Sequence, residues 1–379
     1  MLSKKKLNGI NNNIRYKEID ILKGIGIILM VVGHCNNIFV KFIYLFHMAI
    51  FFMSSGFFWN DKNVQDLKAC KNYVIRKIKT LWLPFFICNS IFTIFNNLFI
   101  HIGFYTNNKL FLKLPIGEYD HLTPILNLKS TFINLTKNCF FTGNTQLGGA
   151  TWFLKTLFVV SITHMIIRYI RCHLKNGKFI SIISLLLACI GAQIISKYQI
   201  RLPLGGSTLF AGYIAFNMGV FIRKFKFVNY IACHQKTCLI ISCFILIVLN
   251  HFGKIEINHG IITNLIFFIT VSLSGWTFIY SLASLTNKHL IGNFLAYIGK
   301  HTIWIVTLHF LCFKIVTLIY IKIKHLSILY LAMFPTINNK SNLWIIYSMV
   351  GVCMPIIIEY LKRKLTAIFF KSKNTCQRL

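Results

Sequence analysis

The sequence predicts an all-α, polytopic integral membrane protein with about ten transmembrane helices and both termini in the cytoplasm. Three observations support this fold class: 56% of the 379 residues are hydrophobic, the mean hydropathy is +0.64, and only 13% of the residues are charged. Soluble domains carry roughly 25% charged residues. A disordered chain is excluded because disorder requires low hydrophobicity. A nucleic acid partner is not expected despite the net charge of +33, because 36 Phe and long Ile and Leu runs need an apolar environment.

Ten stretches approach the roughly 20 apolar residues that a helix needs to cross a bilayer. Pro84 and Pro355 lie inside two of them, and membrane helices tolerate proline where neighbouring groups satisfy the freed carbonyl. The expected spans, in chain order, are about 21–40, 42–59, 81–104, 150–170, 179–196, 207–222, 237–252, 260–285, 295–320 and 342–361.

Lys and Arg residues gather in every second loop between these stretches. About 26 fall in one alternating set, which includes both termini, and about 11 fall in the other set. Cytoplasmic loops of membrane proteins carry the excess of basic residues. The richer set and both termini are therefore expected in the cytoplasm.

This topology divides the chain into three parts. Residues 1–20 form a cytoplasmic basic segment, residues 21–361 form the membrane domain, and residues 362–379 form a cytoplasmic basic tail. The longest connection, about 105–149, is expected on the outer side. The first apolar run is read as a retained span rather than a signal peptide, because it is long and lacks a small-residue cleavage site.

Cysteine and acidic residues limit the possible chemistry. The 12 Cys residues are scattered without a Cys-x-x-Cys pair, so neither a disulfide framework nor a metal site is expected. Only 8 residues are Asp or Glu, which leaves few carboxylates for acid–base chemistry. Histidine is therefore the favoured catalytic base, since its pKa lies near neutral pH.

The first two expected spans hold the densest set of ionisable residues: Asp20, Lys23, His34 and His47. Lys23 and His34 are eleven residues apart, close to three helical turns, so they share one face about 16 Å apart. The second helix returns from outside, which brings His47 to a depth comparable to that of His34. Ionisable residues within spans are often functional. The alternative also stands: each His bonds a neighbouring helix, and Lys23 extends to the interface.

Two motifs in this region resemble those of the membrane-bound acyltransferase-3 family. The segment from Glu18 to His34 resembles that family's opening, and Phe46-His47 through Ser55-Gly56 resembles its second motif. Three shorter matches follow, at Arg76–Lys79 with Leu83-Pro84, at Trp152-Phe153-Leu154, and at His301 through His309.

The sequence departs from the family pattern at three places. Lys23 stands where the family usually has Arg. The Lys ammonium cannot make the paired hydrogen bonds that an Arg guanidinium makes. Ala49 replaces the usual Pro, and the Trp-Ser-Leu-x-x-Glu signature of the O-antigen acetylase branch is absent, with Lys155 following Trp-Phe-Leu instead. The Lys variant resembles the fucose 4-O-acetylase-like branch of polysaccharide O-acetyltransferases.

The resemblance implies an integral-membrane O-acyltransferase in the cytoplasmic (inner) membrane of a bacterium. Such an enzyme moves an acyl group, usually acetyl from cytoplasmic acetyl-CoA, to a hydroxyl of a cell-surface polysaccharide or its lipid-linked precursor. A sugar hydroxyl needs a general base, and His34 is the expected base. His47 is expected to orient His34 or to support the acceptor.

The resemblance also implies a donor site and an acceptor site. The expected contacts with acetyl-CoA are Lys23, Arg76 and Lys79, with Asp20 pairing to a cation to fix its rotamer. Trp152 is expected to stack on the acceptor sugar, although an interfacial belt Trp fits the sequence equally. His309 is expected either to line the cavity for substrate or to bond a neighbouring helix.

Several alternatives stay open at this stage. A glycan exporter or flippase has the same overall composition, and an acyltransferase for a lipid, peptidoglycan or another acceptor has the same motifs. Direct transfer and an acyl-histidine intermediate are both compatible with the residues. The identity of the acyl group and the oligomeric state are not determined by the sequence.

Overall fold

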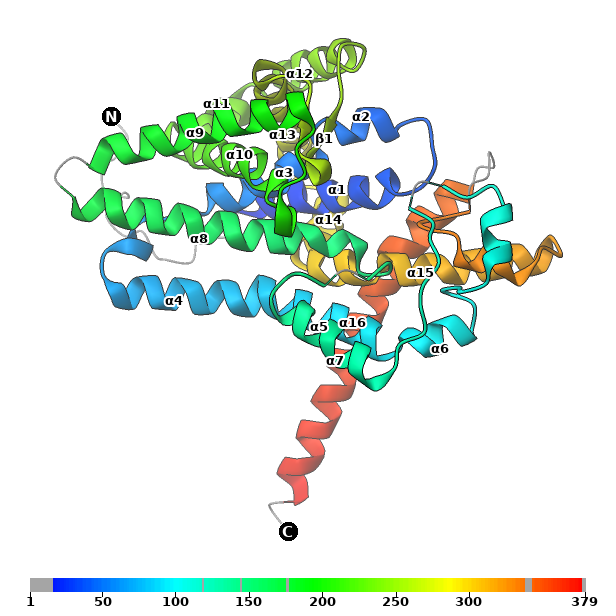
Figure 1. Ribbon diagram of the computed structural model, residues 1–379. Helices are drawn as coiled ribbons and strands as arrows, with labels where there is room; N and C mark the ends of the chain where they lie inside the picture. Colours follow the sequence, from blue (N-terminus) through cyan, green and yellow to red (C-terminus); the bar gives the residue numbers. More distant parts are fainter. Residues whose placement is uncertain (1–15, 118, 144, 175–176, 338–342, 377–379) are drawn as a thin grey trace.

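The computed structural model describes residues 16–117, 119–143, 145–174, 177–337 and 343–376. Most of the expected basic segment 1–20 and the last residues of the expected tail 362–379 therefore lie outside the described part. The apolar runs fold into helices, and the described strands are one short antiparallel pair (Figure 1). The bounds are α1 Lys17–Gly33, α2 Val40–Tyr44, α3 His47–Phe57, α4 Leu67–Lys77, α5 Leu83–Ile94, α6 Asn96–His101, α7 Leu128–Cys139, α8 Trp152–His173, α9 Gly177–Tyr198, α10 Ser207–Lys224, α11 Phe227–Cys233, α12 Gln235–Leu249, β1 Ile255–Glu256, β2 Ile261–Ile262, α13 Leu265–Thr286, α14 Leu290–Lys300, α15 Thr302–Ile323 and α16 Leu343–Cys376.

The structure is that of an all-α polytopic membrane protein, as the sequence predicts. Six helical segments of the described chain are long and apolar enough to cross a membrane, and a seventh is added if α11 and α12, bent by 106°, form one span. The helix α1, which has 17 residues, is not among these segments. The number of ten spans and the cytoplasmic position of both termini stay predictions.

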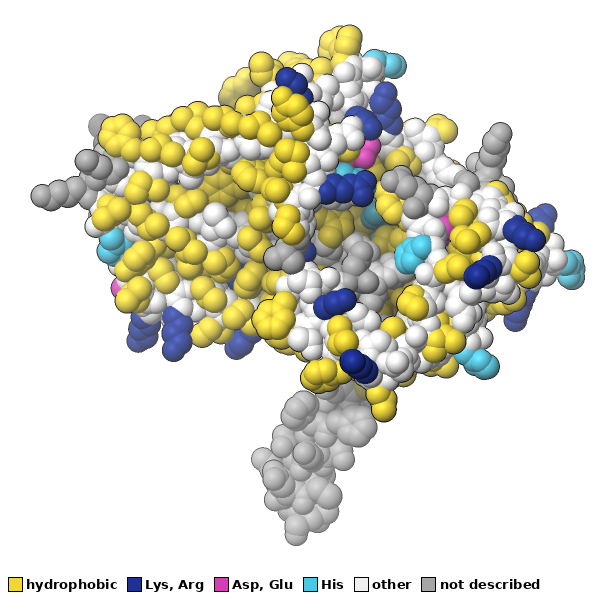
Figure 2. Space-filling view, viewed as in Figure 1, with side chains coloured by type: hydrophobic (Ala, Val, Ile, Leu, Met, Phe, Trp, Pro, Cys, Tyr) yellow, Lys and Arg dark blue, Asp and Glu magenta, His cyan; other side chains and the backbone are white. Residues whose placement is uncertain are grey.

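Apolar surface identifies the faces that lipid covers. The helix α9 exposes a row of large apolar side chains, and Figure 2 shows hydrophobic side chains over the face that α8 and α9 form. In water such a surface would be costly, because each exposed apolar Å² loses about 25 cal/mol relative to burial. The exposed apolar residues of α9 include Phe179, Ile182, Ile183, Leu186, Leu187, Ile190 and Ile194.

Two expected spans differ from the observed helices. In place of the expected span 81–104, the observed helix begins and ends earlier. The helix α4 continues through a π-helical turn at Ile78–Trp82 into α5, which ends at Ile94. Pro84 explains the wide turn, since proline lacks an N–H and its ring clashes with the carbonyl four residues before it. The expected span 295–320 is two helices, because the chain breaks at His301 between α14 and α15.

The helix α1 lies at the centre of the bundle, against α3, α13, α14, α15 and α16. Its contact with α14 is unusually close. A Cβ on Gly24 would lie 2.0 Å from the Leu295 carbonyl oxygen, and a Cβ on Gly299 would lie 1.8 Å from the Asp20 carbonyl oxygen. Both positions therefore need glycine, and this contact fixes the depth of Lys23 and His34 in the bundle.

The long connection expected outside, 105–149, contains a helix that packs back against the bundle. The helix α7 packs against α5, with Asn138 Nδ2 donating to Thr93 Oγ1 at 3.1 Å. At the same end of α7, Trp82 Nε1 donates to the Cys139 carbonyl at 2.9 Å. The chain after α7 consequently returns to α8 as one wall of a cavity.

Candidate active site

His34 lies where α1 ends. Its backbone N–H still bonds the carbonyls of Met30 and Val31, at 3.2 and 3.1 Å, but the next residues leave the helix. Asn37 Nδ2 caps this end by donating to the Val32 carbonyl at 2.7 Å. The end of the helix thus presents the His34 imidazole to a cavity of about 820 Å³.

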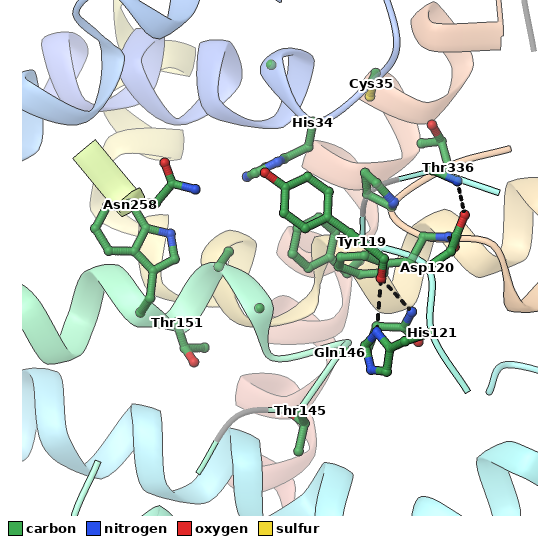
Figure 3. Close-up of a pocket in the computed structure, with 18 of the residues that line it drawn as sticks. His34, Cys35, Tyr119, Asp120, His121, Thr145, Gln146, Thr151, Asn258 and Thr336 are labelled. Atoms are coloured by element: carbon green, nitrogen blue, oxygen red, sulfur yellow. Dashed lines mark hydrogen bonds between the residues drawn. The ribbon is translucent and has the colours of Figure 1, made fainter. Parts of the chain in front are cut away.

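Aromatic and hydrogen-bonding side chains line this cavity together. Figure 3 shows His34 and Asn258 on one side of it, and Thr145, Gln146 and His121 on the opposite side. Cavities of about 300–1,000 Å³ hold small ligands, so one or two sugar rings fit. The aromatic lining residues are Tyr44, Phe85, Tyr119, Phe141, Trp152, Phe310 and Phe334, and the polar ones include Asn36, Asn37, Thr142, Thr151 and Thr336.

A second, much smaller cavity of about 40 Å³ shares His34, Ala150 and Trp152 with the large one. Its walls come from α1, α3, α15 and the chain around the start of α8. The lining residues are Ile27, Met30, His34, Met48, Phe51, Ala150, Trp152, Phe153, Leu154, Thr302, Ile303 and Val306. His34 and Trp152 border both cavities.

The imidazole of His309 lies behind His34. The two rings stack with centroids 5.5 Å apart, and His309 is 0% exposed. His309 Nδ1 lies 2.8 Å from the Ile305 carbonyl oxygen. A carbonyl only accepts, so Nδ1 carries the proton and Nε2 holds a lone pair. The sequence left open whether His309 lines the cavity or bonds a neighbouring helix, and it does neither.

His47 begins α3 and is also buried rather than on the cavity wall. Its Nδ1 lies 2.9 Å from the Ile43 carbonyl oxygen, and its ring packs on Tyr44 with centroids 4.9 Å apart. Tyr44 in turn lines the large cavity. His47 is close enough to His34 for their charges to interact. The convergence of these two imidazoles stays a prediction.

Cationic side chains gather near the start of α1. Lys23 Nζ lies 3.9 Å from Asp20 Oδ1 and 4.9 Å from the centre of the Phe58 ring. Arg76 and Lys77 both pack over the Tyr73 ring, and Arg76 Nη2 donates to Asn63 Oδ1 at 3.0 Å. Lys79 is exposed on the π-helical turn.

Lys77 was not among the expected contacts with acetyl-CoA, yet it lies close enough to Arg76 and Lys23 for their charges to interact. Burial, together with the positive charges of Arg76 and Lys23, lowers the pKa of Lys77 to about 8. Like charges held this close favour a bound polyanion, which would relieve their repulsion.

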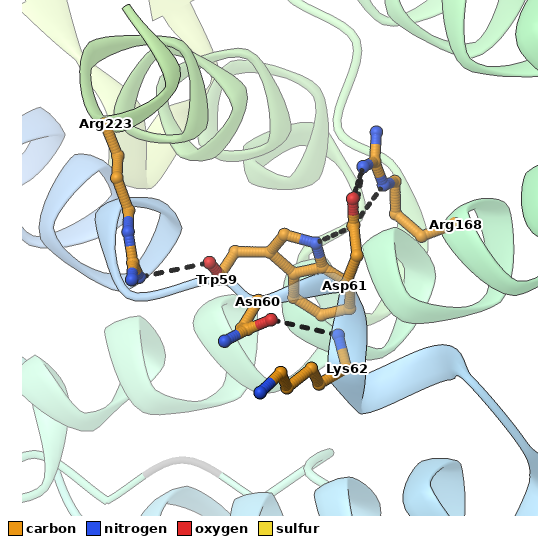
Figure 4. A network of polar contacts seen from close by, with 6 residues as sticks. All are labelled: Trp59, Asn60, Asp61, Lys62, Arg168 and Arg223. Atoms are coloured by element: carbon orange, nitrogen blue, oxygen red, sulfur yellow. Dashed lines mark hydrogen bonds and ion pairs between the residues drawn. The ribbon is translucent and has the colours of Figure 1, made fainter. Parts of the chain in front are cut away.

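An ion-pair network holds the loop between α3 and α4 (Figure 4). Arg168 from α8 donates through Nε and Nη2 to Asp61 Oδ1, at 3.0 and 2.6 Å, and Trp59 Nε1 donates to the same oxygen at 2.8 Å. Arg223 Nη1 donates to the carbonyls of Phe57 and Trp59, at 3.1 and 3.2 Å. Burial raises the pKa of the Asp61 carboxyl, but the Arg168 and Trp59 hydrogen bonds outweigh it and the net direction is downward. The loop that leads to the basic residues is therefore fixed to α8 and α10.

The outer wall of the cavity is held by Asp120. Its Oδ2 accepts from the Gly117 N–H at 2.7 Å and its Oδ1 accepts from the Phe334 N–H at 2.6 Å, which joins two distant segments. Burial raises the pKa of this carboxyl, against the opposing effect of those N–H groups and of Lys314. Lys314 is 0% exposed in α15 and donates to the Leu331 and Met333 carbonyls, at 2.9 and 2.8 Å.

Sequence motifs did not point to several lining residues, among them Tyr44, Tyr119, Asn258 and Thr336. Asn258 belongs to a short 3-10 turn, Ile257–His259, more than 200 residues from His34. No local pattern marks it. Within the described ranges, no group of three or more His, Cys, Asp or Glu side chains is placed to hold a metal ion.

The fold and the site together define a multi-pass membrane protein with a histidine that borders two cavities, a large one lined by aromatic and hydrogen-bonding groups and a small apolar one. Residues 16–362 match the sequence model of a family described as an acyltransferase domain, of the acyltransferase-3 type, and the chain belongs to this family. It is therefore a membrane acyltransferase. No curated protein and no solved structure gives a significant match to the chain.

Proposed function

We propose that this enzyme transfers an acetyl group from cytoplasmic acetyl-CoA to a hydroxyl of a cell-surface polysaccharide or its lipid-linked precursor, in the cytoplasmic membrane of a bacterium, with His34 as general base. The observation that carries the proposal is the position of His34, which borders both the large polar cavity and the small apolar cavity. A base at this position can meet an acceptor from one side and an acyl donor from the other.

The large cavity supports a sugar as the acceptor. Sugars bind through hydrogen bonds to their hydroxyls and through stacking of their apolar faces on aromatic rings. The lining supplies both kinds of contact, with Asn258, Thr145 and Gln146 as hydrogen-bonding groups and Trp152 as an aromatic face. Trp152 opens α8 beside His34, where a stacked ring would present a hydroxyl to the imidazole.

The basic group near the start of α1 fits coenzyme A as the donor. Its phosphates carry several negative charges, and Lys23, Arg76 and Lys77 supply charge-assisted hydrogen-bond donors close together. Lys79 is exposed beside them. Asp20 holds the Lys23 ammonium by its ion pair, so that it stays on the face of α1 that leads to His34.

The chemistry follows from these positions. When bound, acetyl-CoA supplies an activated acyl thioester. His34 accepts the proton of the acceptor hydroxyl while the C–O ester bond forms and the thioester C–S bond breaks, and the proton taken by His34 then neutralises the departing thiolate. His309 stacks on the His34 ring, and His47 packs on Tyr44, which lines the large cavity. General-base catalysis by His34 is expected to raise the rate of acyl transfer by about 10²- to 10⁴-fold.

The test is complementation of a strain that lacks the gene, with surface glycan analysed by mass spectrometry. We expect His34→Ala to remove O-acetyl groups from the glycan while membrane expression is unchanged. His251→Ala, an exposed histidine after α12, is the matched control and should restore acetylation. Full acetylation by His34→Ala would contradict the proposal. Loss of the glycan itself in the deletion strain would indicate an exporter instead.

A further inference from the structure

We propose that the small apolar cavity beside His34 is the subsite for the acyl group, and that its size limits the transferred group to acetyl. This inference rests on the proposed use of acyl-CoA. It adds the residues that decide which acyl group is used, namely Met30, Phe51 and Val306, one from each of α1, α3 and α15.

The cavity lies on a direct line between the basic group and the base. Lys23, Ile27, Met30 and His34 are spaced four, three and four residues apart, so they follow one another along a single face of α1. Ile27 and Met30 are cavity walls, and His34 is its outer end. A thioester whose phosphates sit at Lys23, with its flexible pantetheine arm along this face, would bring its acyl group to this cavity.

The volume of the cavity agrees with an acetyl group. About 10–15 Å³ of such volume holds one water-sized group, so about 40 Å³ holds about three of them. An acetyl group has three heavy atoms, whereas butyryl has five. The walls do not yield easily, because Met30, Phe51 and Val306 are all buried in the main core of the protein.

The chemistry of the walls excludes charged acyl groups. Apart from His34, Thr302 and the Trp152 indole, every lining side chain is purely apolar or a thioether. The free carboxylate of a succinyl group would lose its hydration there without gaining a cationic partner, which is strongly unfavourable. The structure thus favours acetyl over succinyl, a choice that the sequence left open.

The experiment measures binding to the purified full-length chain in lipid nanodiscs by calorimetry, with coenzyme A and its acetyl, propionyl, butyryl and succinyl thioesters. In the unaltered protein we expect acetyl-CoA to bind about fourfold tighter than coenzyme A, the value of one buried methyl group. Butyryl-CoA and succinyl-CoA should bind at least about tenfold more weakly than acetyl-CoA.

Two substitutions enlarge the cavity and one fills it. Val306→Ala and Met30→Ala should make butyryl-CoA bind at least as tightly as acetyl-CoA. Val306→Ile should remove the advantage of acetyl-CoA over coenzyme A. The matched controls are Val316→Ala, on the same helix and equally buried, and Met165→Ala in α8, neither of which lines either cavity. Both should keep the order of affinities of the unaltered protein.

The outcomes separate the two proposals. If all thioesters bind with similar affinity, and the cavity variants do not change their order, the acyl subsite is wrong while acyl-CoA remains the donor. If neither coenzyme A nor any thioester binds, the proposed donor is wrong and the subsite falls with it. A reversed order in Val306→Ala but not in Val316→Ala supports the subsite.

Discussion

The imidazole rings of His34 and His309 stack with their centroids 5.5 Å apart and their planes inclined by 26°. They come from α1 and α15, which are separated by more than 270 residues of sequence. Because His309 Nδ1 donates to the Ile305 carbonyl, its Nε2 is a lone pair, and this atom is buried with no hydrogen-bond partner among the described residues. His309 therefore packs on His34 as a neutral ring with one unused acceptor.

His309 is therefore expected to act through His34. His309→Phe keeps the ring packing but replaces the polar imidazole with an apolar ring, and a specific aromatic contact is worth about 0.5–1.5 kcal/mol beyond its burial. We expect kcat to fall about threefold to tenfold, with unchanged KM for acetyl-CoA. His309→Gln, which keeps an acceptor, should recover part of the loss.

The control for this substitution is His164→Phe. His164 is equally buried, both of its ring nitrogens are without partners in the described part of the chain, and it packs on Trp59 and Phe216. It lines neither cavity. An equal loss of kcat in both variants would show that the His309 effect is only structural.

Lys77 predicts a pH dependence of donor binding. With a pKa of about 8, its ammonium is charged at pH 7 and neutral at pH 9, and only the charged form attracts phosphates. The affinity for coenzyme A is therefore expected to fall as the pH rises through about 8. Calorimetry on Lys77→Gln should show weaker binding at pH 7 and a flatter dependence, whereas Lys71→Gln, exposed on the same helix, should behave as the unaltered protein.

Lys314 is expected to position the outer wall of the cavity. Lys314→Met leaves the Leu331 and Met333 carbonyls without their donor and removes the positive charge that faces Asp120. A buried polar group left without its partner costs about 1–3 kcal/mol, and two carbonyls lose their donor, so thermal unfolding should shift markedly downward. The double variant Lys314→Met with Asp120→Asn should recover part of the stability. Lys322→Met, exposed on the same helix, should leave it unchanged.

Two neighbouring glycines offer a test of the wall before α8. A Cβ on Gly148 would lie 2.3 Å from Asn89 Oδ1 and 2.5 Å from Thr145 Oγ1, and so would disrupt the 2.8 Å hydrogen bond between them. We expect Gly148→Ala to destabilise the protein by about 1–3 kcal/mol. A Cβ on Gly149 would meet only Phe310 and Phe334, both at 3.5 Å, so Gly149→Ala should unfold at the same temperature as the unaltered protein. Equal unfolding temperatures for the two variants would contradict this account.

The local sequence determined the fold class and part of the site. Apolar runs and few charges require a membrane environment, and helical periodicity places Lys23 and His34 on one face of α1 whatever the rest of the chain does. The motifs around them were enough to indicate an acyltransferase. Boundaries were less certain: Pro84 lies inside a helix as predicted, but that helix ends at Ile94 rather than near residue 104.

Only the tertiary structure decided what surrounds His34. The stacking of His309, the lining by Asn258, and the Asp120 and Lys314 supports join segments far apart in the chain, and no periodic pattern encodes such distances. Tertiary packing likewise decided that the Lys77 side chain lies near Lys23, whereas the Lys79 side chain is exposed. Sequence fixes what is periodic along one helix, whereas a cavity forms between helices and depends on how closely glycines such as Gly24 and Gly299 let them pack.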